Sequence, residues 1–353
     1  MTERLKNLRA LFAAKDIDAI MVAKTENVRY ISGFTGDSAT LVVTGKHAFL
    51  VTDSRYTEQA AAEATGFVVA EQKDGLITKT AEVLTELSCK KVGFEGNAVI
   101  FDDWRILTAK AKTAEFVPVK IDVLREIKDE GEVALIKEAC AITDAAFADV
   151  LNFLRPGVTE NEVAAHLEYF MRQKGSERPA FATIVASGVR GSMPHACATN
   201  KLIKSGEFVT MDFGAVYGGY CSDMTRTVAV GKADVRQKEI YAVTLKAQLA
   251  GLSALKAGKS GIEVDKAARD SMGQYAKYFG HSLGHGVGLE IHENPRLSSK
   301  SKCEHLPINA IVTVEPGVYI PGLGGVRIED TTRITANGCE RLTLSPKELI
   351  EIF

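Results

Sequence analysis

Two segments in the second half of the chain resemble each other, and each carries one acidic residue inside an apolar strand pattern. The first is VTMDFGAVY (209–217) and the second is VTVEPGVY (312–319), so Asp212 and Glu315 occupy equivalent places. A glycine turns the chain after each acid, as a hairpin requires. Self-similarity of this kind predicts two related structural units joined by an internal pseudo-twofold repeat.

Each unit continues into a return strand with a second acid, Asp223 in the first and Glu329 in the second. Burying a carboxylate in a strand costs several kcal/mol unless it is paired or bound to a cation. Hard divalent cations suit oxygen ligands, and two of them roughly 3.5–4 Å apart form a recurrent hydrolytic site. The alternative is simple ion pairing of these acids with nearby arginines: Arg226, Arg327 or Arg333.

The segment between the two hairpins, HSLGHGVGLEIHE (281–293), is dense in histidine. It contains His281, His285 and His292 out of seven histidines in the whole chain. A single histidine is more often an ordinary core residue than a ligand, but this density favours a functional site. The glycines within the segment suit a backbone that bends sharply and approaches a ligand closely.

These motifs together resemble the metal-binding signature of the aminopeptidase P and prolidase family, whose catalytic domain has the pita-bread fold. All five ligand positions of that signature match: Asp212, Asp223, His285, Glu315 and Glu329. The first part of the chain also resembles the family, in the segments NVRYISGFTG (27–36), TDSRYTEQ (52–59) and VGFE (92–95).

The resemblance implies a role for each ligand. Asp212 and Asp223 would bind one metal, Asp223 and Glu329 would bridge, and His285 and Glu315 would complete the shell of the second metal. A water between two cations has a lowered pKa and can attack a peptide carbonyl at neutral pH. The implied cofactors are two divalent ions, with Mn²⁺ ranked first and Co²⁺, Zn²⁺ or Fe²⁺ as alternatives.

Resemblance also implies three catalytic side chains. Glu315 would shuttle a proton between the attacking water and the leaving nitrogen, a role that typically contributes ~10²–10⁴-fold. His292 would contact the scissile carbonyl or stabilise the tetrahedral intermediate, and His195, in GSMPHA (191–196), would help to hold the substrate.

Two further residues are candidates for substrate binding. His281 matches a position that lines the proline subsite of the family. Arg327 lies two positions before Glu329, so we expect it on the same strand face, where it could orient the bridging carboxylate or close the proline pocket. A plain structural ion pair is the alternative for Arg327.

The length of the chain favours two domains, because 353 residues exceed the size at which one hydrophobic core usually stops growing. Apolar runs alternate with helical periodicity in the first part, and the charged segment LREIKDEGE (124–132) leads into a long helix that we expect to reach about residue 153. Thr159 and Glu162 have the capping-box spacing, which predicts a second helix to about residue 174.

We therefore expect an α/β (α+β) protein with a smaller creatinase-like α/β domain at 1–122 and a pita-bread catalytic domain at 123–353. In the resembled family the N-terminal domain commonly helps to form a dimer and narrows the entrance to the cleft. A homodimer is therefore the expected assembly.

The charge balance argues against large charged partners, since 43 basic and 45 acidic residues leave a net charge of −2. No global field would draw this chain to nucleic acid or to an anionic membrane. The N-terminus interleaves charges with apolar residues and lacks a run long enough for a signal peptide, which favours a cytoplasmic location.

The expected activity is that of an Xaa-Pro aminopeptidase on short proline-containing peptides, with Xaa-Pro dipeptidase (prolidase) as the alternative. The substantial first domain argues against a methionine aminopeptidase. Five intact ligands argue against a creatinase-like amidinohydrolase and against a non-catalytic binding module. The preference for proline rests on the resemblance alone, whereas the metal chemistry has separate support from the repeat.

Overall fold

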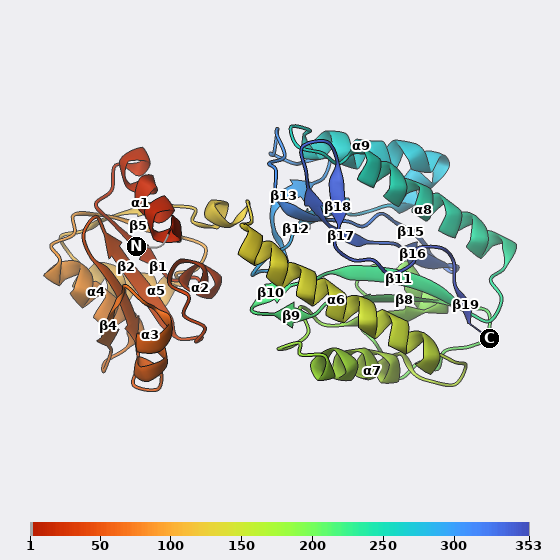
Figure 1. Ribbon diagram of the computed structural model, residues 1–353, viewed down its shortest axis with the longest axis horizontal. Coiled ribbons are helices and arrows are strands. Elements are labelled where there is room, and N and C mark those ends of the chain that lie inside the picture. The colour runs from red at the N-terminus through yellow and green to blue at the C-terminus, as the bar shows by residue number, and fades with distance from the viewer. Residues whose placement is uncertain (1–2, 353) are drawn as a thin grey trace. The chain divides into compact units, whose positions relative to one another are not determined.

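The computed structural model describes residues 3–352 and separates into two compact units, one ending at Arg125 and the other beginning at Glu126 (Figure 1). Each unit has a sheet core of its own. Within the described residues, no helix is both long enough and apolar enough to cross a membrane.

The first unit is built on a six-stranded mixed sheet with the order β4-β3-β2-β1-β5-β6. The helices α4 (Leu76–Glu86) and α5 (Phe101–Lys110) pack against one of its faces through a shared apolar cluster. The strands are β1 (Ala19–Val22), β2 (Ala39–Thr44), β3 (Ala48–Thr52), β4 (Val68–Glu71), β5 (Lys91–Phe94) and β6 (Glu115–Pro118). The remaining helices are α1 (Glu3–Lys15), α2 (Thr25–Ser32), α3 (Thr57–Glu63) and the 3₁₀ turn η1 (Asp122–Arg125).

The alternation of apolar runs and helical segments predicted for the first part of the chain is present, but the pattern did not single out the helix α2. The start of α2 depends on a residue far along the chain: the buried carboxylate of Glu95 accepts hydrogen bonds from the backbone N–H groups of Ala23 (2.7 Å) and Lys24 (3.0 Å). These two donors lie just before the first helical residue, Thr25, and no local pattern reveals their partner.

The second unit contains a four-stranded sheet, β19-β11-β8-β7, and a five-stranded sheet, β13-β12-β14-β17-β18. Two short ribbons, β9-β10 and β15-β16, complete it. The strands of the first half are β7 (Ile184–Ser187), β8 (Glu207–Phe213), β9 (Val216–Tyr217), β10 (Tyr220–Cys221) and β11 (Met224–Val230). Those of the second half are β12 (Gly284–Gly286), β13 (Glu293–Leu297), β14 (Ile311–Val314), β15 (Gly317–Ile320), β16 (Gly324–Arg327), β17 (Asp330–Ile334), β18 (Cys339–Arg341) and β19 (Glu351–Ile352).

Two helix pairs enclose these strands from opposite sides (Figure 1). The helices α6 (Glu130–Phe153) and α7 (Glu160–Gln173) share a core with the four-stranded sheet, and α8 (Val235–Ala254) and α9 (Gly261–Met272) share one with the five-stranded sheet. All four helices begin with a complete capping box, which satisfies two open backbone donors each. The predicted box at Thr159 and Glu162 is among them and is confirmed.

Strand alternation turns the predicted acids away from the helices. Met211 and Phe213 enter the core under α6 and α7, so Asp212 between them faces the interior of the unit. In the second half Val314 enters the core under α8 and α9, so Glu315 after it faces the same interior. The two layers therefore present their acids toward each other.

Candidate metal centre

The repeat seen in the sequence is present as two hairpin units. In the first, β8 leads through the β9-β10 ribbon to β11; in the second, β14 leads through the β15-β16 ribbon to β17. Asp212 lies within β8, whereas Asp223, Glu315 and Glu329 lie one residue outside a strand. The expectation of acids in the middle of strands is therefore right for Asp212 only. The others lie at strand ends, where side chains are freer to turn toward one another.

Three of the expected ligands form a tight group. Asp223, His285 and Glu329 each offer a ligand atom, and these atoms all lie within 4.8 Å of one another. The Nε2 atom of His285 is also 3.3 Å from Oε1 of Glu315. This spacing allows one small cation to contact several of these groups at once.

One cavity gathers all nine residues that the sequence singled out. Its volume is about 390 Å³, within the range of sites that hold small molecules. On its wall lie His195, Asp212, Asp223, His281, His285, His292, Glu315, Arg327 and Glu329. The placement agrees with a shared site, and the role of each residue stays a prediction.

The imidazole of His285 is oriented by its own backbone neighbourhood. Its Nδ1 atom lies 3.1 Å from the carbonyl oxygen of Gly286, which can only accept, so Nδ1 carries the proton. The Nε2 atom faces Asp223 and Glu315, so it donates to a carboxylate when it is protonated and offers its lone pair to a cation when it is not. A histidine fixed in this way is the usual arrangement for a metal ligand.

The carboxylates are too crowded to be ionised together without added positive charge. Burial, followed by the charges of neighbouring carboxylates, raises the pKa of Asp223 and of Glu329 well above their ordinary values. Burial also raises the pKa of Glu315, but the hydrogen bond and charge of His285 outweigh it and bring that pKa to about 2. Divalent cations would remove the repulsion that the first two acids experience.

Asp212 supplies a direct sign of a missing partner. Its Oδ2 atom accepts a hydrogen bond from Arg327 at 2.6 Å, yet its buried Oδ1 atom has no hydrogen-bond partner among the described residues. Buried carboxylate oxygens are almost always satisfied. Together with the imidazole and the other carboxylates, this donor set fits hard or borderline divalent cations.

Arg327 links Asp212 to His281 through a chain of hydrogen bonds. Its NH1 donates to the hydroxyl of Tyr319 (2.9 Å), and that hydroxyl in turn donates to Nε2 of His281 (2.9 Å). Arg327 thus pairs with Asp212. The same-face argument had suggested Glu329 as its partner. Tyr319 is not among the residues predicted for the site, but it joins the cavity arginine to the cavity histidine.

Paired threonines hold Asp223 and Glu329 from opposite strands. The hydroxyl of Thr225, two residues after Asp223, donates to Oε2 of Glu329 at 2.7 Å and accepts from Nε of Arg327 at 2.9 Å. The hydroxyl of Thr331, two residues after Glu329, donates to the backbone carbonyl of Asp223 at 2.7 Å. Each repeat unit therefore positions the acid of the other.

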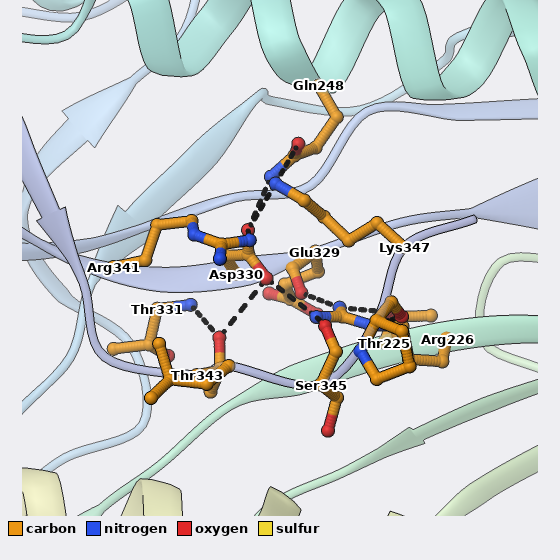
Figure 2. Close-up of polar contacts among 12 residues, drawn as sticks. Thr225, Arg226, Gln248, Glu329, Asp330, Thr331, Arg341, Thr343, Ser345 and Lys347 are labelled. Atoms are coloured by element: carbon orange, nitrogen blue, oxygen red, sulfur yellow. Dashed lines mark hydrogen bonds and ion pairs between the residues drawn. The ribbon is translucent and has the colours of Figure 1, made fainter.

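A buried ionic cluster lies directly behind Glu329 (Figure 2). Arg226 donates to the backbone carbonyl of Glu329 and to Oδ1 of Asp330 (2.7 Å), and Lys347 donates to Oδ2 of Asp330 (2.8 Å). Gln248 of α8 donates to the same oxygen (3.0 Å). Arg226 was a candidate partner for the predicted ligands, and the structure pairs its side chain with Asp330 instead.

The glycines of the histidine segment serve the packing of strands. A Cβ atom on Gly284 would lie 1.9 Å from the carbonyl oxygen of Thr313, and one on Gly286 would lie 2.1 Å from that of Asn294. Close approach was predicted, but the neighbour is protein backbone rather than a ligand. This contact brings β12, and with it His285, against β14 and β13.

Comparison with known proteins identifies the family. Residues 134–336 match Metallopeptidase family M24, and residues 4–127 match the Creatinase/Prolidase N-terminal domain. The chain belongs to metallopeptidase family M24. Its larger unit is accordingly a pita-bread catalytic domain, the smaller is a creatinase-type N-terminal domain, and the expected fold is confirmed.

Proteins similar to this M24 chain over nearly its whole length carry two different names, Xaa-Pro dipeptidase and X-Pro aminopeptidase. A solved structure named Xaa-Pro dipeptidase from Bacillus anthracis superposes with a TM-score of 0.96 at 45% identity, covering 99% of both chains. A solved X-Pro aminopeptidase from Thermotoga maritima gives 0.91 at 37% identity, covering 99% of this chain and 100% of its own. The Xaa-Pro dipeptidase of Pyrococcus horikoshii is 40% identical over 99% of both chains.

M24 metallopeptidases use divalent metals, so the hydroxyl of Thr225 has a testable consequence. Thr225→Val keeps the shape of the buried side chain but removes the donor to Glu329 and the acceptor for Arg327. We expect the affinity for Mn²⁺ to fall by about 10–100-fold, the usual cost of losing a partner behind a metal ligand. Isothermal titration with Mn²⁺ measures it.

The matched control is Thr332→Val, because the buried hydroxyl of Thr332 donates to the carbonyl oxygen of Val312 instead of to a ligand. Its affinity for Mn²⁺ should remain that of the unmodified protein. Equal affinities in both variants would show that Thr225 does not support the centre.

Proposed function

We propose that this M24 metallopeptidase hydrolyses the peptide bond between an N-terminal residue and proline in short peptides, as an Xaa-Pro aminopeptidase. The observation that carries the proposal is the single cavity in which five metal-type ligands converge with three further histidines and an arginine. The relatives named above support the proline preference. Because they carry both names, the Xaa-Pro dipeptidase activity is the alternative.

The five proposed ligands are Asp212, Asp223, His285, Glu315 and Glu329. They would hold two divalent cations, with Mn²⁺ ranked first and Co²⁺, Zn²⁺ or Fe²⁺ as alternatives. When bound, such a pair supplies Lewis acidity and an activated water for attack on a peptide carbonyl. The raised pKa values of the bridging acids and the unpartnered oxygen of Asp212 support this occupancy.

The chain's own groups would handle the protons and the developing charge. Glu315, with its pKa near 2, is ionised at neutral pH and can accept the proton of the attacking water and pass it to the leaving nitrogen. Burial, followed by the charge of His285, lowers the pKa of His292 to about 4. His292 would therefore be a neutral N–H donor for the carbonyl oxygen as charge builds there.

The rest of the cavity wall suits a proline ring. Phe181, Ile184 and Ile291 add apolar surface to the cavity that His281 also lines. A bond before proline is a tertiary amide without an N–H donor, so recognition must come from the ring's shape and apolar surface. Burial is the main cause that lowers the pKa of His281, which keeps this wall uncharged at neutral pH.

A peptide panel tests the proposal. With Mn²⁺ present, the protein should cleave Ala-Pro-Ala after alanine and leave Met-Ala-Ser intact. Cleavage of Ala-Pro without Ala-Pro-Ala would instead establish the dipeptidase alternative. Hydrolysis of Met-Ala-Ser alone would contradict both and indicate a methionine aminopeptidase, which the matched N-terminal domain already disfavours.

His292→Ala separates substrate handling from metal binding. The His292 ring packs edge-on against His285 at 4.4 Å between centroids, yet it is not part of the tight ligand group. We expect a loss of about 10²–10³ in kcat, the usual cost of one donor to a developing oxyanion. Native mass spectrometry should still find two Mn²⁺ ions per chain. Unchanged kcat, or loss of metal, would refute the assignment.

Three predictions from the sequence accompany the proposal. The chain would form a homodimer, with the N-terminal unit contributing the contact and the rim of the cleft, and it would work in the cytoplasm. The substrate would be a short proline-containing peptide. The domain boundary at 122/123 likewise stays a prediction.

A further inference from the structure

The segment that carries His195 is a loop whose position depends on side-chain contacts. It leaves β7 at Ser187, passes through the 3₁₀ turn η2 (Gly188–Ser192) and ends near Thr199. His195 lies on the cavity wall beyond η2, outside any strand, and an isolated bridge between Cys197 and Ile184 of β7 pairs the backbone nearby. Something else must hold the loop if its histidine is to meet a substrate in a defined place.

One fully buried carboxylate closes the base of this loop. Glu160, the first residue of α7, is 0% exposed. Its Oε1 atom accepts from the backbone N–H and the hydroxyl of Ser187, both at 2.8 Å. Its Oε2 atom accepts from the backbone N–H (3.2 Å) and the hydroxyl (2.7 Å) of Thr199. The two ends of the loop are thus held by the two oxygens of one side chain.

An arginine extends this clamp toward the histidine. Arg190 donates from Nε to Oε2 of Glu160 at 3.0 Å and from NH2 to the backbone carbonyl of Cys197 at 2.6 Å. On the other side of His195, the carbonyl of Pro194 accepts from Arg327 at 3.2 Å. The chain around His195 is therefore tied to α7 through Arg190 and to the ligand-bearing strands through Arg327.

We propose that Glu160 and Arg190 are positioning residues, which act through the loop to set where the imidazole of His195 lies. This inference rests on the role of His195 in the proposed function. A buried carboxylate with six hydrogen-bond contacts would also stabilise the fold, so stability cannot separate a positioning role from a structural one. Coupling between Glu160 and His195 can separate them, because only positioning requires the histidine.

The experiment is a double-mutant cycle of Glu160→Gln and His195→Ala on the full chain with Mn²⁺. Glu160→Gln keeps the shape of the side chain but places an amide where five donor groups point. We expect two Mn²⁺ per chain and a kcat/KM for Ala-Pro-Ala about 10–100-fold lower, as a displaced catalytic group costs. In the His195→Ala background the same substitution should change kcat/KM by less than about twofold.

Glu162→Gln is the matched control. It makes the same chemical change on the same turn of α7, but Glu162 is exposed and, among residues 3–352, forms hydrogen bonds only within its capping box. It should leave kcat/KM unchanged in both backgrounds. If Glu160→Gln does not fold, Arg190→Gln replaces it, because that variant leaves the contacts of Glu160 with Ser187 and Thr199 in place and should show the same dependence on His195.

Different results would overturn the proposed role of His195 and the positioning role of Glu160 and Arg190. If His195→Ala itself has no effect on kcat/KM, the proposed role of His195 is wrong. If His195→Ala lowers kcat/KM but the clamp variant has no effect, or has the same effect in both backgrounds, the positioning inference is overturned while the proposed function stands.

Discussion

Glu329→Ala is expected to leave the protein folded, largely free of bound metal and almost without peptidase activity. Glu329 belongs to the tight ligand group, and its side chain is buried, with 1% exposed. An alanine there offers no ligand atom. Removing it also leaves Thr225 without its acceptor. Losing several kcal/mol of charge stabilisation in the transition state corresponds to a fall in kcat/KM of roughly 10³-fold or more.

Metal content should be counted by native mass spectrometry after reconstitution with Mn²⁺, together with hydrolysis of Ala-Pro-Ala. Glu340→Ala is the control, since Glu340 is a half-exposed glutamate that pairs with Lys137 at the surface. It should retain both ions and full activity. Two tightly bound ions in Glu329→Ala would remove Glu329 from the ligand set.

Asp330→Ala is expected to lower the free energy of unfolding by about 3–5 kcal/mol. Burial would raise the pKa of Asp330, but the charges of Arg226 and Lys347 outweigh it and hold that pKa below its ordinary value. The carboxylate is 0% exposed, and its removal would leave the buried charges of Arg226 and Lys347 without their anion (Figure 2).

Urea unfolding of the metal-free protein, followed by circular dichroism, measures this loss without any contribution from bound ions. Asp149→Ala provides the comparison, because Asp149 pairs with His166 in a partly exposed position and should cost no more than about 1 kcal/mol. A similarly small loss for Asp330→Ala would show that the cluster behind Glu329 is not a stabilising element.

The convergence of the five proposed ligands on one cavity could be predicted because the repeat is visible in local sequence patterns. Asp212 and Glu315 follow alternating strand residues, and each return acid lies a short, glycine-turned hairpin away. Alternation and hairpin closure are properties of neighbouring residues, so they survive in the sequence. The family resemblance then gave each acid a role.

The groups that hold these ligands could not be predicted in the same way. Thr225 meets Glu329, Arg226 meets Asp330 and Glu160 meets Thr199 only because distant segments are brought together by packing. The residues next to a threonine or an arginine in a strand do not reveal which distant side chain it will contact. The reciprocal spacing of Thr225 and Thr331, each two residues after a return-strand acid, is the one signal in the sequence that could have indicated such support.

The central claim is that two divalent ions, held by the five ligands, carry out hydrolysis at proline. It is tested most directly by following hydrolysis of Ala-Pro-Ala by EDTA-treated protein while Mn²⁺ bound per chain is counted during back-titration. We expect no turnover in the metal-free protein and turnover that rises until two ions are bound. Full turnover without metal, or a chain that never binds two ions, would contradict it.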